Sequence, residues 1–220
     1  MKFKTIAAIL SVCLAVFSFA ACDIGIKAKE YVPTSENYFD FVEIGGSYAI
    51  SAKSGVALPS EIHLPTDYHG EKVTVVAEDA FSGSAITKII VPSSYKEIKE
   101  RAFKDCAALR NVTLNSVEKI GNQAFADCAG LSVINFPAEL NEIGEFAFYQ
   151  TEVTNLKFIG VKSIGKFAFY GCKNLKYVYI PSTTTSIGES AFGGIDAAIN
   201  FDVSSSNEYY TVSGGTIAEK

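Results

Sequence analysis

The chain contains no tryptophan, only two histidines and one methionine among its 220 residues. Histidine is the side chain most often used for proton transfer and metal binding near neutral pH, so few candidates for catalysis exist. Basic residues are not in excess, because 19 Lys and Arg stand against 24 Asp and Glu. The resulting net charge of −5 supplies no basic footprint for nucleic acid, and we expect no nucleic-acid partner.

One long apolar run is present, at the N-terminus. Residues 5–21 carry no charge and follow Lys2 and Lys4. A basic start, an apolar stretch and small residues before a cleavage site are typical of a secretory signal peptide. A transmembrane anchor is the alternative, although the run is at the lower length limit for spanning a bilayer. We interpret residues 1–21 as a signal peptide.

The end of this run, Phe19-Ala20-Ala21-Cys22, resembles the bacterial lipobox, although the lipobox prefers Leu where Phe19 stands. The resemblance implies that Cys22 is lipidated and becomes the mature N-terminus, which would tether the protein to a membrane. Residues 22–40 are polar without clear periodicity and predict a tether. The remaining residues, 41–220, are predicted to form one folded domain.

An internal repeat governs that domain. The dipeptide Ala-Phe recurs at intervals of 22, 22, 23, 21 and 23 residues, and an aliphatic residue stands five positions before each Phe. In four of the six copies Gly follows this aliphatic residue. The six repeat phenylalanines are Phe81, Phe103, Phe125, Phe148, Phe169 and Phe192. Periods of 20–50 residues indicate repeat architectures in which stacked units share one core.

The repeat can be written Leu-x-x-Val-x-Ile-Pro-x-x-x-x-x-Ile-Gly-x-x-Ala-Phe-x-x-Cys-x-x, and it resembles the BspA-type leucine-rich repeats of bacterial surface proteins. The resemblance implies a leucine-rich repeat solenoid, a right-handed single-domain superhelix of 21–23-residue repeats with short parallel strands and turns. Residues 41–75 would form its starting segment, 76–203 its repeats and 204–220 a partial terminal repeat.

Each repeat is expected to contribute two strands on opposite walls. Val112 and Leu114 alternate with Thr113 as in a short strand, and the aliphatic residue before Gly would end the second one. We expect Gly to permit the corner that follows and the repeat Phe to fill the interior. On the second wall, Lys96 should face Glu118, and Lys119 should face Glu97 and Glu142.

Three cysteines follow a repeat Phe by three residues: Cys106, Cys128 and Cys172. No histidine joins them, so we expect no metal site there. We favour buried free thiols, and a disulfide between the first two is the alternative. Two repeats are one residue shorter and carry Ser84 and Thr151 instead, which predicts a tighter turn without room for a thiol.

Two sets of side chains are candidates for ligand binding. On the outward side of the first strand, the alternation places Asn135, Lys157 and Tyr179 in one row and Asn155 and Tyr177 in the next. On the edge beside the repeat Phe, coils four and five carry four additional aromatic residues: Phe146, Phe167, Tyr149 and Tyr170. A solvated strand face and a mutually shielding ring cluster are the alternatives.

Catalysis has little support. His63, Asp67 and His69 lie close in sequence, but no nucleophile, zinc or phosphate-binding motif accompanies them. We expect neither an enzyme nor a bound cofactor or metal. We therefore favour an exported, lipid-anchored surface module that binds a protein or glycan through one face of the solenoid, and the BspA-type resemblance implies adhesion to host matrix or to other cells. The alternative is a structural envelope scaffold without an extracellular ligand.

Overall fold

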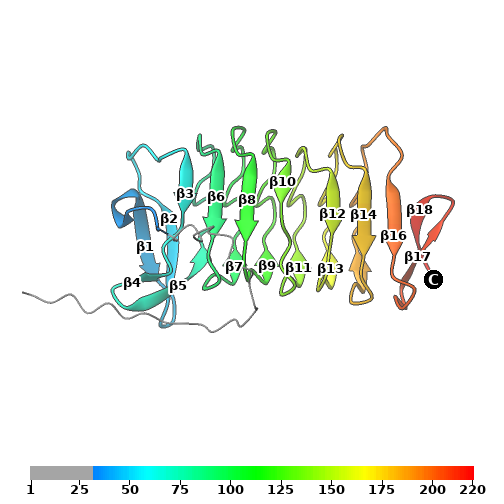
Figure 1. Ribbon diagram of the computed structural model, residues 1–220, viewed down its shortest axis with the longest axis horizontal. Helices are drawn as coiled ribbons and strands as arrows, with labels where there is room; N and C mark the ends of the chain where they lie inside the picture. Colours follow the sequence, from blue (N-terminus) through cyan, green and yellow to red (C-terminus); the bar gives the residue numbers. More distant parts are fainter. Residues whose placement is uncertain (1–31) are drawn as a thin grey trace, which may run out of the picture. The chain divides into compact units, whose positions relative to one another are not determined.

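The computed structural model describes residues 32–220, which form a β-solenoid of about seven turns (Figure 1). The predicted repeat solenoid is thereby confirmed. Two walls of short strands run along it, and successive turns pair in parallel. The first wall contains β3 (Glu61–His63), β6 (Lys88–Val91), β8 (Asn111–Leu114), β10 (Val133–Ile134), β12 (Asn155–Lys157), β14 (Tyr177–Ile180) and β16 (Asn200–Val203).

The second wall is one sheet that continues to the N-terminal end of the described chain. Its parallel strands are β2 (Tyr48–Ala52), β5 (Glu71–Val76), β7 (Glu97–Ile98), β9 (Lys119–Ile120), β11 (Glu142–Ile143), β13 (Ser163–Ile164) and β15 (Ser186–Ile187). Antiparallel partners are added by β1 (Phe39–Glu43), which pairs with β2, and β4 (Asp67–Tyr68), which pairs with β5. A short 3-10 helix, Glu36–Tyr38, precedes β1.

The repeat phenylalanines form one continuous column inside the solenoid. Neighbouring rings are stacked with centroids 5.0–5.6 Å apart and planes within 8° of parallel, from Phe81 to Phe192. Phe39 packs edge-on against Phe81 and closes the N-terminal end of the column. The four inner rings therefore each lie between the rings of two neighbouring coils, which is why a single coil could not bury one.

The folded region begins before residue 41. The Thr34 amide donates a hydrogen bond to the His63 carbonyl at 2.8 Å, and the His63 amide donates to Thr34 Oγ1 at 2.9 Å. Because β1 begins at Phe39, residues 34–40 are part of the fold rather than of a tether. The predicted signal peptide, Cys22 and the rest of the predicted tether up to residue 31 lie outside the described residues.

Glycine is needed after the second-wall aliphatic residue, but for a different reason from the one expected. Gly121, Gly144, Gly165 and Gly188 do not adopt positive φ. A Cβ at any of them would lie 2.4–2.8 Å from backbone atoms of the preceding coil. These glycines are required because the backbones of adjacent coils approach too closely for a side chain.

The turn around the repeat Phe uses left-handed backbone twice in each coil. The residue two positions before Phe has φ of 52–55° in all six coils, although none of them is Gly: Asp79, Arg101, Gln123, Phe146, Phe167 and Ser190. The residue two positions after Phe has φ of 55–73° and is Gly in three coils. The repeat geometry imposes these conformations whatever residue is present.

The three cysteines are buried free thiols, as favoured, and the alternative disulfide is wrong. Each thiol donates a hydrogen bond to the Phe carbonyl of the preceding coil, at 3.0–3.2 Å. That the shorter turns at Ser84 and Thr151 have no room for a thiol stays a prediction. Their hydroxyl oxygens lie in the same row, each 3.3 Å from the sulfur of the next coil's cysteine.

The second wall carries the expected charge pairs. Lys96 and Glu118 lie 2.9 Å apart, and Lys119 and Glu142 lie 3.2 Å apart, each between adjacent coils. Glu97 is in register with Lys119. These pairs are about half exposed, so each contributes only tenths of a kcal/mol and mainly favours one register.

The C-terminal end is closed by an antiparallel hairpin rather than by another parallel coil. The hairpin pairs β17 (Tyr210–Ser213) with β18 (Thr216–Glu219). Asn207, 1% exposed, anchors it: its side chain donates to the carbonyls of Pro181 and Thr184 and accepts from the amides of Tyr209 and Tyr210. One amide side chain thus joins the cap to the preceding coil.

Replacing Asn207 with Ala should lower the free energy of unfolding by about 3 kcal/mol, because it leaves buried carbonyl and amide groups without partners. Urea denaturation followed by circular dichroism measures the loss. Asn200→Ala, an exposed asparagine on β16, is the matched control and should change stability by less than about 0.5 kcal/mol. Equal effects of the two substitutions would contradict the anchoring role.

The three buried thiols should resist alkylation in the folded protein. Burial raises the pKa of Cys172 to about 11, so mildly alkaline conditions do not generate its reactive thiolate. Mass spectrometry of peptides after iodoacetamide treatment should find Cys106, Cys128 and Cys172 modified only when urea is present. Ser82→Cys, which places a thiol at an exposed position of the first coil, should be modified in the native state. Rapid native labelling of the three would refute their burial.

Candidate functional site

The outward side of the first wall carries more varied side chains than the outward side of the second wall. The structure confirms the register of its rows, because Asn155 pairs with Tyr177 and then Asn200, and Lys157 pairs with Tyr179 and then Asp202. The wall is divided, since β10-β8-β6-β3 form one sheet and β12-β14-β16 another. The second of these sheets carries the candidate site.

A groove of about 620 Å³ lies over β12, β14 and the start of the following turn. We call it the strand-face groove. It is lined by Lys157, Phe158, Ile159, Tyr177, Tyr179, Pro181, Ser182 and Asp202. Ile159 is 55% exposed, so the groove offers an apolar side chain beside two tyrosine rings and two charged groups. This combination of an apolar centre and a few polar groups is typical of recognition surfaces.

Charge in the groove is arranged across three strands. The Lys157 ammonium, the Tyr179 ring and the Asp202 carboxylate follow one another in register on β12, β14 and β16. The Tyr177 hydroxyl donates a 2.9 Å hydrogen bond to Asp202 Oδ2. This bond raises the pKa of Tyr177, since ionisation would place a negative oxygen against the carboxylate. The hydroxyl therefore stays protonated and holds the carboxylate in place.

The structure brings together three of the five predicted strand-face residues: Lys157, Tyr177 and Tyr179. Asn155 lies beside the groove, opposite Tyr177. Asn135 directly follows β10 of the other sheet, and its side chain pairs with backbone: Oδ1 accepts from the Leu114 amide and Nδ2 donates to the Leu114 carbonyl. Asn135 is therefore a strand-pairing residue at the division of the wall and not part of the groove.

Sequence reasoning missed Asp202 and Ile159 as members of the site. Asp202 follows Tyr179 in the same outward row, so the row itself was a signal for it. Ile159 follows Lys157 by two residues and continues the outward alternation past the end of β12. Ser182 and Pro181 come from the turn after β14, and no sequence pattern points to their presence in the groove.

The predicted edge aromatics do form a cluster. Phe146 stacks on Phe167 with centroids 4.9 Å apart, and Tyr149 stacks on Tyr170 at 5.9 Å. Each Phe meets the Tyr of its own coil edge-on, at 5.7 and 5.5 Å. All four rings are half-buried, so they shield one another in part and still reach solvent.

The same edge is charged in the first coils. Arg101 donates to both oxygens of Asp79, at 2.9 and 3.0 Å, and contacts Glu78 and Glu100. These hydrogen bonds lower the pKa of Asp79 and raise that of Arg101. The edge therefore changes from ionic to aromatic character between the second and fourth coils.

Comparison with known families identifies the repeat. Six copies of the BspA type leucine rich repeat region match residues 60–160 and 157–213. The chain belongs to the BspA-type leucine-rich repeat family. No curated protein matches it.

Solved structures share the fold of this BspA-type protein. A leucine-rich repeat protein of T. pallidum is 24% identical with a TM-score of 0.57, covering 74% of this chain and 89% of that one. A leucine-rich cell surface protein of Faecalibacterium prausnitzii is 23% identical with a TM-score of 0.63, covering 87% and 59%. A pneumococcal vaccine antigen is 19% identical with a TM-score of 0.54, covering 88% and 55%. The chain thus spans less than two thirds of the latter two proteins.

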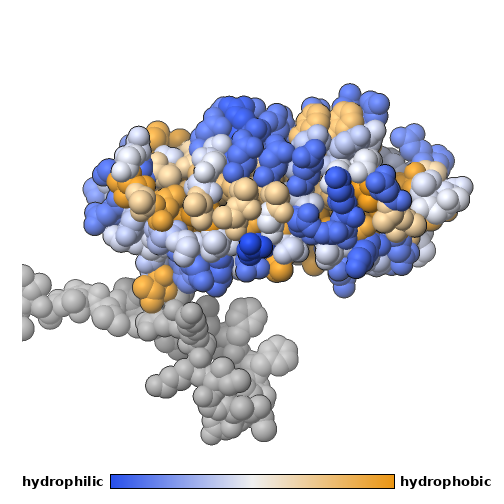
Figure 2. Space-filling view, turned by 90° about the horizontal axis from the view of Figure 1, so that it is seen from above, coloured by the Kyte–Doolittle hydropathy of each residue, from blue (hydrophilic) through white to orange (hydrophobic). Residues whose placement is uncertain are grey.

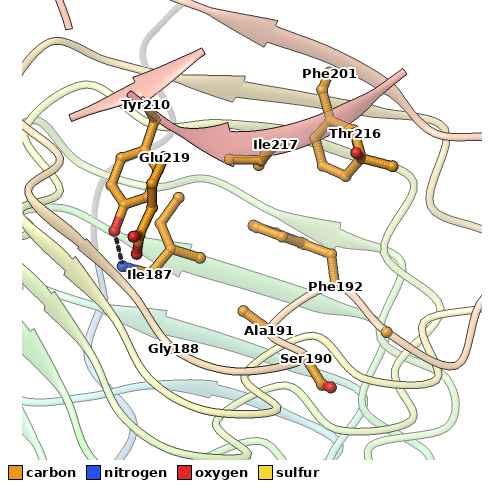
Figure 3. A pocket seen from close by; sticks show the side chains of 11 residues that line it. Ile187, Gly188, Ser190, Ala191, Phe192, Phe201, Tyr210, Thr216, Ile217 and Glu219 are labelled. Carbon is orange, nitrogen blue, oxygen red and sulfur yellow. Dashed lines mark hydrogen bonds between the residues drawn. The ribbon is translucent and has the colours of Figure 1, made fainter. Parts of the chain in front are cut away.

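A second hollow of the BspA-type solenoid lies under the C-terminal hairpin (Figure 3). It measures about 390 Å³, and Phe192, Phe201 and Ile217 point into it. The Tyr210 hydroxyl accepts a 2.8 Å hydrogen bond from the Ile187 amide and holds the hairpin over the last coil. Phe192 is the last ring of the central column, so the hollow marks where that column ends.

The two histidines lie against other groups of the fold. His63 Nδ1 lies 3.1 Å from the Val32 carbonyl oxygen, and the His69 ring stacks on Tyr68 at 4.0 Å. Residues 32–220 contain no group of three or more His, Cys, Asp or Glu placed to hold a metal ion. Across the same residues no helix has the length and apolar character needed to cross a membrane.

The hydropathy of one face is shown in Figure 2, where a band of more apolar residues runs between hydrophilic margins.

Proposed function

We propose that this protein is an exported surface module that binds a protein ligand through the strand-face groove. The observation that carries the proposal is the groove itself, where Tyr177, Tyr179, Lys157, Asp202 and Ile159 meet on a preformed sheet. Tyrosine is enriched at protein interfaces because a large apolar ring is combined with a polar tip. A parallel sheet already holds the backbone beneath these groups, so binding requires no ordering of the backbone.

The pattern of charge favours a protein partner of complementary polarity. Lys157 and Asp202 flank Tyr179 on either side, so a ligand that places a carboxylate over the first and a basic group over the second gains both contacts. The solved relatives include a protein described as a cell surface protein, which supports surface exposure. Adhesion to host matrix or to other cells is the role we propose for this binding.

Alanine at Tyr179 should weaken ligand binding at least tenfold, which is about 1.4 kcal/mol, because the ring at the centre of the groove is lost. The measurement is capture of the purified domain by immobilised extracellular-matrix and cell-envelope proteins, followed by titration. Tyr209→Ala is the control, since Tyr209 is 49% exposed on the C-terminal cap and does not line the groove. Identical binding by the Tyr179 variant would contradict the groove, whereas capture by none of these proteins would favour the alternative of an envelope scaffold without an extracellular ligand.

Attachment to the membrane through acylated Cys22 is the second part of the proposal. It is supported by the lipobox-like sequence Phe19-Ala20-Ala21-Cys22 and by its place some ten residues before the described chain begins. The tether between them would allow the solenoid to extend from the membrane surface.

Cells that express the protein should incorporate radioactive palmitate into it, and Cys22→Ser should abolish the label and release the protein into the soluble fraction. Cys13→Ser is the matched control and should leave both results unchanged, because Cys13 would be removed with the signal peptide. Label that persists after Cys22→Ser would exclude this anchor.

A further inference from the structure

The backbone hydrogen bonds of the turn edge all run in one direction along the solenoid. In each of the first five coils, three amides around the repeat Phe donate to carbonyls of the next coil, at 2.7–3.1 Å. The donors are the repeat Phe and the residues two positions before and after it. In the fifth coil the amides of Phe167, Phe169 and Gly171 donate to the carbonyls of Glu189, Ala191 and Gly193.

The sixth coil has the same three donors and no coil to accept from them. Its donor positions are the amides of Ser190, Phe192 and Gly194, and none of the three has a hydrogen-bond partner among residues 32–220. The C-terminal hairpin is held on the other side of this coil, where the Tyr210 hydroxyl meets the Ile187 amide. A row of unpaired backbone groups is a template on which another chain can pair.

The interior of the sixth coil is also covered incompletely. The first five phenylalanines of the column are 0–1% exposed, whereas Phe192 is only half-buried. The hollow of about 390 Å³ lies against this ring, and Phe192, Phe201 and Ile217 point into it (Figure 3). Ser190 lines the same hollow, so the unpaired amides and the apolar cavity belong to one site. We call this site the open coil end.

The five stacked pairs of coils show what fits on such a surface. The segment that accepts the three bonds always offers the carbonyl groups at the third position before its Phe, directly before it and directly after it. The residue directly before Phe is Ala in every coil and is at most 6% exposed. The Phe ring stacks on that of the preceding coil with centroids 5.0–5.6 Å apart. A matching occupant is therefore a peptide in which a small residue precedes an aromatic one.

A second copy of this chain does not present that segment at its opposite end. The N-terminal end of the column is closed by Phe39, which packs edge-on against Phe81 and is 3% exposed. The Ala80 carbonyl of the first coil is occupied as well, because it accepts a 2.9 Å hydrogen bond from the Ala52 amide. Head-to-tail stacking of two copies is blocked by these groups, which favours a peptide segment of a different protein.

We propose that the open coil end binds a peptide segment of a partner protein as one further turn of the solenoid. The amides of Ser190, Phe192 and Gly194 donate to three carbonyls of the peptide, and its aromatic side chain enters the hollow and stacks on Phe192. In this mode of recognition the main-chain bonds supply affinity and the side-chain pocket supplies specificity. The site is separate from the strand-face groove and does not rest on the ligand proposed for that groove.

A synthetic peptide tests the proposal. The probe is Ile-Gly-Glu-Ser-Ala-Phe-Gly-Gly, blocked at both termini, which copies residues 187–194 and so contains the acceptor segment that the fifth coil already binds. Titrated into the ¹⁵N-labelled full chain, it should shift the amide signals of Ser190, Phe192 and Gly194 downfield and saturably. The same peptide with Ala in place of its Phe should bind at least tenfold more weakly, because the hollow stays empty.

Matched controls separate this binding from non-specific contact. The all-D peptide has the same side chains but the wrong hand for the turn, and it should produce none of these shifts. Ile217→Trp should abolish binding by filling the hollow, whereas Ala218→Trp places the same ring on the next residue of β18, which does not line the hollow, and should leave binding unchanged. Tyr179→Ala alters the strand-face groove and should also leave it unchanged. A thermal melt shows whether each variant retains the fold.

Several outcomes would overturn the proposal. No shift at millimolar peptide, equal binding of the all-D peptide, or binding that survives in a folded Ile217→Trp protein would each do so. Equal affinity for N-acetylphenylalanine amide would assign the hollow to a small aromatic ligand instead of a peptide. Self-association of the protein without peptide, abolished by Ile217→Trp, would assign the open coil end to a second copy.

Discussion

Stacking of each coil on the next is the interaction on which the rest of this structure depends. A coil of about 22 residues contributes one interior Phe to the column, and inside the column that ring is stacked between the rings of its two neighbours. The column therefore needs a group at each end that covers its terminal ring. Phe39 supplies it at the first coil, and the hairpin anchored by Asn207 supplies it at the last.

Stacking also turns every position of the repeat into a row. Because equivalent residues face one another at a constant spacing, like side chains along a row produce a ladder, as with the thiols and hydroxyls that run through Cys106 and Cys172. Alternating charges produce ion pairs, as between Lys119 and Glu142. A site for a ligand arises where a row departs from its own pattern, because the departure leaves a group unmatched by its neighbours.

The proposed strand-face groove is a departure of this kind. In the strand-face groove, one row holds a cation, a ring and an anion on three adjacent strands, which suits the mixed surface of a protein. The groove lies on strands and a turn held by the coils on either side, so the proposal does not require the solenoid to change shape.

The sequence by itself determined the period, the two walls, the interior Phe and the membership of the rows, because equal spacing along the chain becomes equal placement in stacked coils. Only the tertiary structure decided which row members meet. Asn135 turns to the Leu114 backbone, and Asp202 binds Tyr177 across the diagonal of the sheet. Thr151 stands in the thiol row despite the shorter turn. These outcomes depend on side-chain direction and on distances between coils, and spacing along the sequence contains neither.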